Sequence, residues 1–159
     1  MTSSSVESQL LAETLARLDL SDYCLVTADT SVRDAVGRMR VTRKNCAFII
    51  GRGTQLIGIL TDRDVLNRVA TAPDVWDAPV STVMTPAPDT LPPDAETAAA
   101  LRLMEQGSYR NVPVVDQHGT ITGNVTHFAI LKFLTAHFPQ AVYNLPPDPT
   151  NYPPERDGG

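Results

Sequence analysis

The sequence has few cysteines and no long hydrophobic run. Its two cysteines, Cys24 and Cys46, are too few for a disulfide framework or for a cysteine-based zinc site. No apolar stretch reaches the roughly 18 residues that a membrane-spanning helix needs, and no basic segment followed by an apolar one opens the chain. We therefore expect no membrane insertion, no secretory signal and a reduced, cytoplasmic location.

Positive charge is also scarce over the chain as a whole. The formal net charge is -5, which disfavours binding to a nucleic acid polymer, because that binding needs clustered cations. However, one 36-residue stretch holds most of the 13 basic residues. Two interpretations stay open: a solvated helix face, or a local attractor for a small anion. The stretch contains Arg33, Arg38, Arg40, Arg43, Lys44, Arg52, Arg63 and Arg68.

The composition is that of a globular protein, and the chain repeats itself. Its 159 residues, 42% of them hydrophobic, suit one domain or two very small ones packed together. Identical residues recur at an offset of 65 positions, as in Gly58 and Gly123 or Thr61 and Thr126. The predicted elements recur with them, so each half is expected to be a strand–helix–strand–strand–helix unit. Neither half has enough core to be stable alone, which favours packing of one half on the other.

The local patterns place these elements. Apolar residues at helical spacing predict helices over 32–39 and 97–104, and β-branched runs bounded by turns predict paired strands. Further helices are expected to begin at Thr61 and Thr126, whose hydroxyls suit an N-cap. We expect five segments: an N-terminal helix in 1–20, repeat 1 in 21–72, a connector in 73–85, repeat 2 in 86–138 and a Pro-rich C-terminal tail in 139–159.

Three phrases in the sequence carry a family resemblance. GILTDRD (58–64), VSTVMTP (80–86) and RNVPVVD (110–116) resemble the CBS domain, named after cystathionine β-synthase, and two tandem copies form a Bateman module. The resemblance implies an α+β fold of two tandem βαββα repeats related by pseudo-twofold symmetry. It also implies clefts between the repeats that commonly hold adenine nucleotides or related adenosine compounds, and pairing of two modules into a homodimer.

The helix expected to begin at Thr61 offers the chemistry of a ribose site. A carboxylate there, Asp64, can accept hydrogen bonds from both ribose hydroxyls, next to the hydroxyl of Thr61. Exposed amides at a helix start favour phosphate oxygens, and Arg63 and Lys44 could neutralise them. The alternative is that Thr61 and Asp64 form only a capping box. Both roles can coexist.

The resemblance also implies that residues of the connector and of repeat 2 complete this nucleotide site. The matching positions are Thr82, Ala87, Tyr109, Arg110 and Asn111. Alternatively, Arg110 is simply exposed at the start of a strand, and Tyr109 covers the core.

The second repeat departs from the family pattern. Three residues after Thr126, Ala129 stands where the ribose-binding aspartate would be. The missing charge-assisted hydrogen bonds cost on the order of 1.5–3 kcal/mol. We therefore predict one competent cleft at Asp64 and a degenerate second site at Thr126 and Ala129 that is weak or vacant.

Catalytic machinery is not evident in the sequence. His127 and His137 are ten residues apart, not the four that would let them share a metal on one helix face, and no Gly-rich phosphate loop or paired carboxylates stand out. We expect no enzyme, no catalytic residue, no metal site and no required cofactor.

The expected function is therefore that of a stand-alone regulatory module. It would bind AMP, ADP, ATP or S-adenosylmethionine between its repeats and modulate a separate partner protein. The alternative is a ligand-free dimerisation or interaction scaffold, which Ala129 and a leucine-faced N-terminal helix favour.

Overall fold

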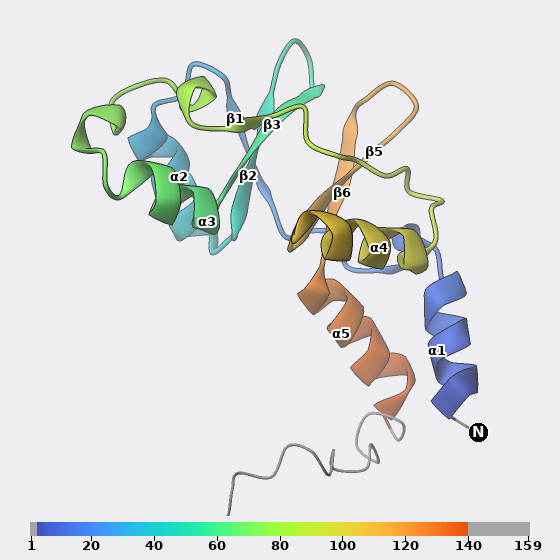
Figure 1. Ribbon diagram of the computed structural model, residues 1–159. Coiled ribbons are helices and arrows are strands. Elements are labelled where there is room, and N and C mark those ends of the chain that lie inside the picture. Colours follow the sequence, from blue (N-terminus) through green and yellow to red (C-terminus); the bar gives the residue numbers. More distant parts are fainter. Residues whose placement is uncertain (1–2, 140–159) are drawn as a thin grey trace, which may run out of the picture.

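The computed structural model describes residues 3–139, with side chains from residue 6. Residues 140–159, nearly all of the expected Pro-rich tail, lie outside the described part. Figure 1 shows the two halves side by side, with the strands toward the middle and the helices of each half around them.

The first half follows the predicted order of elements. It consists of β1 (Cys24–Thr27), α2 (Val32–Thr42), β2 (Cys46–Ile50), β3 (Leu56–Thr61) and a closing helix. That closing helix is one α-helical turn, α3 (Asp62–Asp64), which continues as a π-helical turn, η2 (Val65–Val69). The start of α2 is capped by the Ser31 hydroxyl, which accepts a hydrogen bond from the Asp34 amide at 3.0 Å.

The second half repeats this order except for its first strand. It consists of α4 (Thr97–Gly107), β5 (Asn111–Val115), β6 (Ile121–Thr126) and α5 (His127–His137). In place of the expected first strand, Leu91 makes a single parallel bridge to Val114. Between the halves, the connector forms two 3₁₀ turns, η3 (Pro73–Val75) and η4 (Val80–Thr82), and then β4 (Thr85–Pro86).

The N-terminal helix is shorter than its leucine pattern predicts. It runs as α1 (Ser3–Ala12) and is followed by a 3₁₀ turn, η1 (Leu15–Arg17). The chain leaves the helix because the Leu15 amide donates to the Ala95 carbonyl at 2.9 Å, which ties this segment to the second half. Its buried leucines, Leu10 and Leu15 among them, join the core formed with α4, β5, β6 and α5.

Each half also contributes a strand segment to the other. The first sheet has the order β1-β2-β3-β4, in which β4 leads into the second half and pairs with β3. Conversely, the segment that leads into the first half pairs with β6, where the Asn124 amide donates to the Leu20 carbonyl at 2.9 Å. This exchange joins the halves through backbone hydrogen bonds.

The hairpin turns of the two halves meet in a way that reveals the pseudo-twofold axis. The Leu56 amide donates to the Gly119 carbonyl at 3.3 Å, and the Ile121 amide donates to the Thr54 carbonyl at 3.5 Å. Adding 65 to Leu56 gives Ile121, and subtracting 65 from Gly119 gives Thr54, so the second bond is the first with the two halves exchanged. The two halves are therefore related by a rotation, as the sequence repeat predicts.

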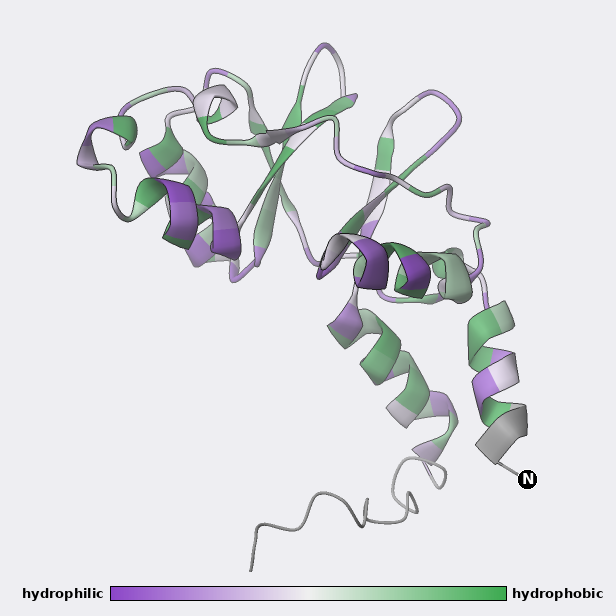
Figure 2. Cartoon of the chain, in the orientation of Figure 1, coloured by the Kyte–Doolittle hydropathy of each residue, from purple (hydrophilic) through white to green (hydrophobic). Residues whose placement is uncertain are grey.

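The core follows this division into halves. One buried cluster lies in each half, and a third joins them. In that third cluster Phe48 is fully buried and stacks on Tyr23, with ring centroids 4.9 Å apart, while Ile121 packs against it from the second half. Figure 2 shows hydrophilic residues concentrated on α3, hydrophilic and hydrophobic residues alternating along α4, and a mostly hydrophobic α5.

Gly58 and Gly123, which stand at the 65-residue offset in β3 and β6, should respond unequally to substitution by alanine. A methyl group on Gly123 would overlap Cβ of Leu20, which is fixed to the backbone, whereas one on Gly58 would meet the flexible end of Met84. We expect Gly123→Ala to lower the free energy of unfolding by about 1–3 kcal/mol, because the paired segment must shift. Gly58→Ala serves as the matched control and should cost less in urea denaturation; equal losses would contradict the argument.

Candidate functional site

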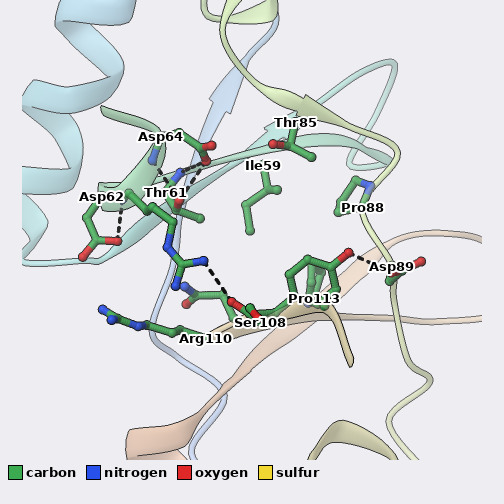
Figure 3. Close-up of a pocket in the computed structure, with 14 residues that line it drawn as sticks. Ile59, Thr61, Asp62, Asp64, Thr85, Pro88, Asp89, Ser108, Arg110 and Pro113 are labelled. Carbon is green, nitrogen blue, oxygen red and sulfur yellow. Dashed lines mark hydrogen bonds between the residues drawn. The ribbon is translucent and has the colours of Figure 1, made fainter. Parts of the chain in front are cut away.

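A pocket opens between the two halves at the start of α3. One wall comes from β3 and α3, the second from the chain that follows β4, and the third from the end of α4 and the start of β5. Figure 3 shows Asp64 and Thr61 on one side of this pocket and Pro113 and Ser108 on the other. Because the pocket spans both halves, a molecule bound there would contact both repeats.

The carboxylate of Asp64 is fixed by the chain around it. Its Oδ2 accepts hydrogen bonds from the Thr61 amide at 2.9 Å and the Thr61 hydroxyl at 2.7 Å, and the Asp64 amide donates back to that hydroxyl. The capping box is thus present. The other oxygen, Oδ1, lies 3.7 Å from Nε of Arg68, and the side chain is 15% exposed. Capping leaves Oδ1 with free lone pairs, so the two roles weighed for Asp64 are compatible.

Arg68 links this carboxylate to the connector. Its Nη1 donates to the Val83 carbonyl at 3.0 Å and to the Thr85 hydroxyl at 3.4 Å. The guanidinium is therefore held between Asp64 and the segment that forms the second wall.

The third wall begins where α4 ends. Ser108 takes the left-handed conformation, with φ at 52°, and turns the chain so that the next residues face the pocket. The Tyr109 hydroxyl donates to Oδ2 of Asp89 at 3.2 Å, and this bond and the nearby carboxylate charge raise the pKa of Tyr109. The Asn111 amide oxygen accepts from Nδ2 of Asn124 at 2.9 Å, which fixes the Asn111 side chain at the pocket edge.

Two arginines lie at the pocket. Nη1 of Arg63 donates to the Ser108 carbonyl at 2.9 Å, a bond that joins the first half to the second. The Arg110 side chain makes no hydrogen bond or ion pair within the described part of the chain, and Figure 3 shows it on the same side of the pocket as Asp62.

Six of the nine residues expected at this site line the pocket together: Thr61, Arg63, Asp64, Tyr109, Arg110 and Asn111. Thr82 of the connector and Ala87 at the start of repeat 2 do not line it. The Thr82 hydroxyl donates to the Pro79 carbonyl at 2.7 Å within η4, and Ala87 sits in a left-handed turn with φ at 43°.

The residues that line the pocket in their place come from neighbouring positions. They are Thr85, Pro88 and Asp89, because the turn at Ala87 points the chain on either side of it inward. Ile59 also lines the pocket, and its position two residues before Thr61 on the same strand face was a signal available in the sequence. No sequence signal marked Asp89.

The structure places Lys44, which was expected at the Asp64 site, at a different pocket. It lines a second pocket with Thr126 and Ala129, and its Nζ donates to the Ser21 carbonyl at 2.8 Å. The physical reason is the pseudo-twofold axis. Residues after α4 face the helix start of the first half, so the corresponding residues after α2, Lys44 among them, face the helix start of the second half.

This second pocket has the same cap without the carboxylate. The Thr126 hydroxyl accepts from the Ala129 amide at 3.0 Å, as Thr61 does from Asp64, but the Ala129 methyl group is buried and offers no acceptor. Lys132 pairs with Asp19 at 2.8 Å across the pocket and holds the pKa of Asp19 well below its usual range.

Between residues 3 and 139 no group of three or more His, Cys, Asp and Glu side chains is arranged to hold a metal. None of the helices there has both the length and the apolar character needed to cross a membrane.

Among curated proteins, the chain is similar to relatives of very different lengths. It is 36% identical over 104 residues to the CBS domain-containing protein CBSCBSPB1 of Arabidopsis thaliana, an alignment that covers 65% of this chain and 19% of that protein. It is 23% identical to an uncharacterized 17.7 kDa protein of Acidianus ambivalens, over 73% of this chain and 70% of that one. The chain thus corresponds to about a fifth of the length of the first relative.

Solved structures share the fold. A structure of CBSX2 in complex with AMP superposes with a TM-score of 0.67 at 23% identity and covers 77% of this chain and 96% of that one. The CBS domain pair of MJ0100, in complex with 5-methylthioadenosine and S-adenosyl-L-methionine, gives 0.68 at 20% identity over 77% and 99%. The family model of the CBS domain matches residues 19–71 and 80–136, which are the two halves described above. The chain therefore belongs to the CBS domain family and contains two CBS domains.

Proposed function

We propose that this chain is a regulatory module that binds an adenosine-containing ligand in the Asp64 pocket and thereby modulates a partner protein. The observation that carries the proposal is the fixed, partly buried Asp64 carboxylate, which faces a wall from the other repeat. Two structures of the same fold hold AMP or 5-methylthioadenosine and S-adenosyl-L-methionine, which supports an adenosine ligand.

Each wall has a suitable role in holding such a ligand. Asp64 would accept hydrogen bonds from the ribose hydroxyls, and Arg63 and Arg110 would meet a phosphate. Pro88 and Pro113 offer apolar surfaces against which a purine can pack. We expect the base to lie toward Pro88, which Figure 3 shows at the opposite end of the pocket from the Arg110 side chain.

Regulation would follow from the position of the pocket between the repeats. Nη1 of Arg63 already bonds the Ser108 carbonyl across the gap, so a phosphate that draws Arg63 away changes a contact between the halves. A ligand that binds one arrangement of the halves better than another shifts the population toward it. A partner protein that senses that arrangement would then be controlled by the ligand.

The second candidate function is a ligand-free homodimerisation or interaction scaffold. Apolar side chains are exposed on helices of both halves: Leu66 is 69% exposed, and Phe128 and Leu131 of α5 are 77% and 52% exposed. Exposed apolar residues that gather on one helix mark contact surfaces. A scaffold and a ligand-binding module differ in their response to nucleotides.

A thermal-shift screen with AMP, ADP, ATP and S-adenosylmethionine tests the proposal. A ligand that binds only the folded chain stabilises it by about 2.7 kcal/mol at a concentration 100 times its Kd, and so raises the Tm. The control is 2′-deoxy-AMP, which lacks one hydroxyl that Asp64 would bind and should raise the Tm less than AMP does. No shift with any adenosine compound at millimolar concentration would favour the scaffold.

Gly107→Ala is expected to damage the pocket with little effect on the fold. A methyl group at this last residue of α4 would overlap the Tyr109 ring, which lines the pocket and must move. We expect a loss of about 1 kcal/mol of binding free energy for AMP, roughly fivefold in affinity, by titration calorimetry. Gly37→Ala is the matched control, because Gly37 also lies in a helix and has no atom within 4 Å of the added methyl group. Equal affinities of the two variants would contradict the role of Tyr109.

A further inference from the structure

We propose that the Asp64 pocket selects adenosine ligands with no more than one phosphate, and that it binds AMP more tightly than ATP. This inference rests on the proposed function, since it names the ligand class of the same site. It comes from the distribution of charge around the pocket, which differs from what the sequence suggests.

The lining of the pocket carries more negative than positive charge. Three carboxylates, Asp62, Asp64 and Asp89, face two guanidinium groups, Arg63 and Arg110. Polyphosphate groups need an excess of cations around them, because each added phosphate brings further negative charge into the site. The pocket lining instead has an excess of negative charge.

Arg68, the next guanidinium, does not reverse this balance. It lies 3.7 Å from the Asp64 carboxylate and donates to the Val83 carbonyl and the Thr85 hydroxyl. Its charge offsets that of Asp64, and its donors are directed to the connector. Counting Arg68 therefore brings the site to neutrality and no further.

The Arg-rich stretch of the sequence does not converge on the pocket either. Of its eight cations only Arg63 lines it. Nε of Arg33 pairs with Asp77 at 3.0 Å, and Arg43 and Lys44 line the second pocket. The remaining members are exposed elsewhere on the first half; these are Arg38 and Arg40 of α2 and Arg52 of the hairpin turn.

The amides at the start of α3 are also occupied. The Arg63 amide donates to Oδ1 of Asp62 at 2.8 Å, and the Asp64 amide donates to the Thr61 hydroxyl. The usual phosphate-binding feature of a helix start, a set of free N–H groups, is therefore reduced here. Only side-chain cations are left to meet a phosphate.

The positions of the charged side chains favour the binding of one phosphate group and disfavour a second or third. With its ribose on Asp64, a ligand would place its first phosphate near Arg63 and Arg110, and the Arg110 side chain has no partner within the described residues that would compete. A second and third phosphate would extend past Asp62, which lies on the same side as Arg110 in Figure 3. Of the four ligands expected from the sequence, ADP and ATP are thereby disfavoured. AMP remains because it has one phosphate, and S-adenosylmethionine remains because it has none and carries a positive sulfonium.

The test is titration calorimetry of the full chain with adenosine, AMP, ADP and ATP in magnesium-free buffer at low and high salt. We expect the Kd to rise from AMP to ATP by about tenfold or more, and the gap to narrow at high salt as repulsion is screened. ATP binding as tightly as AMP would overturn this inference and leave the proposed function intact. If none of these compounds binds and S-adenosylmethionine, titrated in the same buffer, does not bind either, the proposed function itself fails.

The variant Asp62→Asn tests whether the preference for AMP over ATP arises from the charges that line the pocket. Asp62→Asn removes a lining carboxylate and should lower the ratio of the ATP Kd to the AMP Kd severalfold. Asp74→Asn, which removes the same charge from an exposed position in η3 outside the lining, should leave the ratio unchanged. A ratio that Asp62→Asn does not alter, or that both variants alter equally, would overturn the inference.

Discussion

Asp64→Ala is expected to lower the affinity for AMP by roughly 10- to 150-fold. The loss corresponds to the 1.5–3 kcal/mol of hydrogen bonds from the ribose hydroxyls to a charged acceptor. The carboxylate is held in place at both oxygens, because Oδ2 accepts from the Thr61 amide and hydroxyl and Oδ1 lies 3.7 Å from Arg68. Titration calorimetry with AMP measures the change directly.

Two controls separate this loss from a loss of folding. Asp64→Asn keeps an oxygen that can cap the Thr61 amide but removes the charge, so it should retain the Tm better than Asp64→Ala while still losing most of the affinity. Asp74→Ala removes a carboxylate that does not line the pocket and should bind AMP as the unaltered chain does.

The ribose assignment has a sharper test in the same experiment. The unaltered chain should prefer AMP over 2′-deoxy-AMP, and Asp64→Ala should abolish that preference because no charged acceptor is left for the 2′-hydroxyl. If Asp64→Ala binds AMP with unchanged affinity, the ligand does not sit on this carboxylate and the proposed site is wrong.

The sequence predicts the order of elements well because local signals specify them. Thr61 and Thr126 cap the helices that follow them, as expected from residue type alone. The offset of 65 residues predicts the relation between the halves, and the paired turn contacts at Leu56 and Ile121 confirm it. Where local signals compete with tertiary contacts, the prediction is less accurate: α1 ends at Ala12 because the following backbone bonds to the second half.

The site was predicted less completely because its walls depend on how the halves face each other. Lys44 was expected beside Asp64, and a sequence carries no direct record of which helix start its segment will face. The connector was expected to contribute, and it does, but the left-handed turn at Ala87 directs Thr85 and Asp89 inward instead of Thr82. A positive φ at an alanine is uncommon and has no signature in residue type.

Phe48→Ala is expected to lower the free energy of unfolding by about 3–5 kcal/mol, the usual cost of removing a buried aromatic ring. Phe48 is fully buried in the cluster that joins the halves, stacks on Tyr23 and pairs in register with Ile59, which lines the Asp64 pocket. The cavity would therefore loosen the packing between the repeats and the pocket wall together. Urea denaturation followed by circular dichroism measures the stability, and AMP titration measures the pocket.

The control for Phe48→Ala is an equally buried residue away from the joint. Leu15 is also fully inaccessible but belongs to the core of the second half alone, so Leu15→Ala should cost about 2–5 kcal/mol while leaving AMP affinity unchanged wherever the chain is folded. Phe48→Ala should weaken AMP binding as well, because Ile59 loses the ring that supports it. A loss of stability with full AMP affinity would show that the joint between the repeats and the ligand pocket are energetically independent. That outcome would remove the physical route by which a ligand at Asp64 could change the arrangement of the two halves.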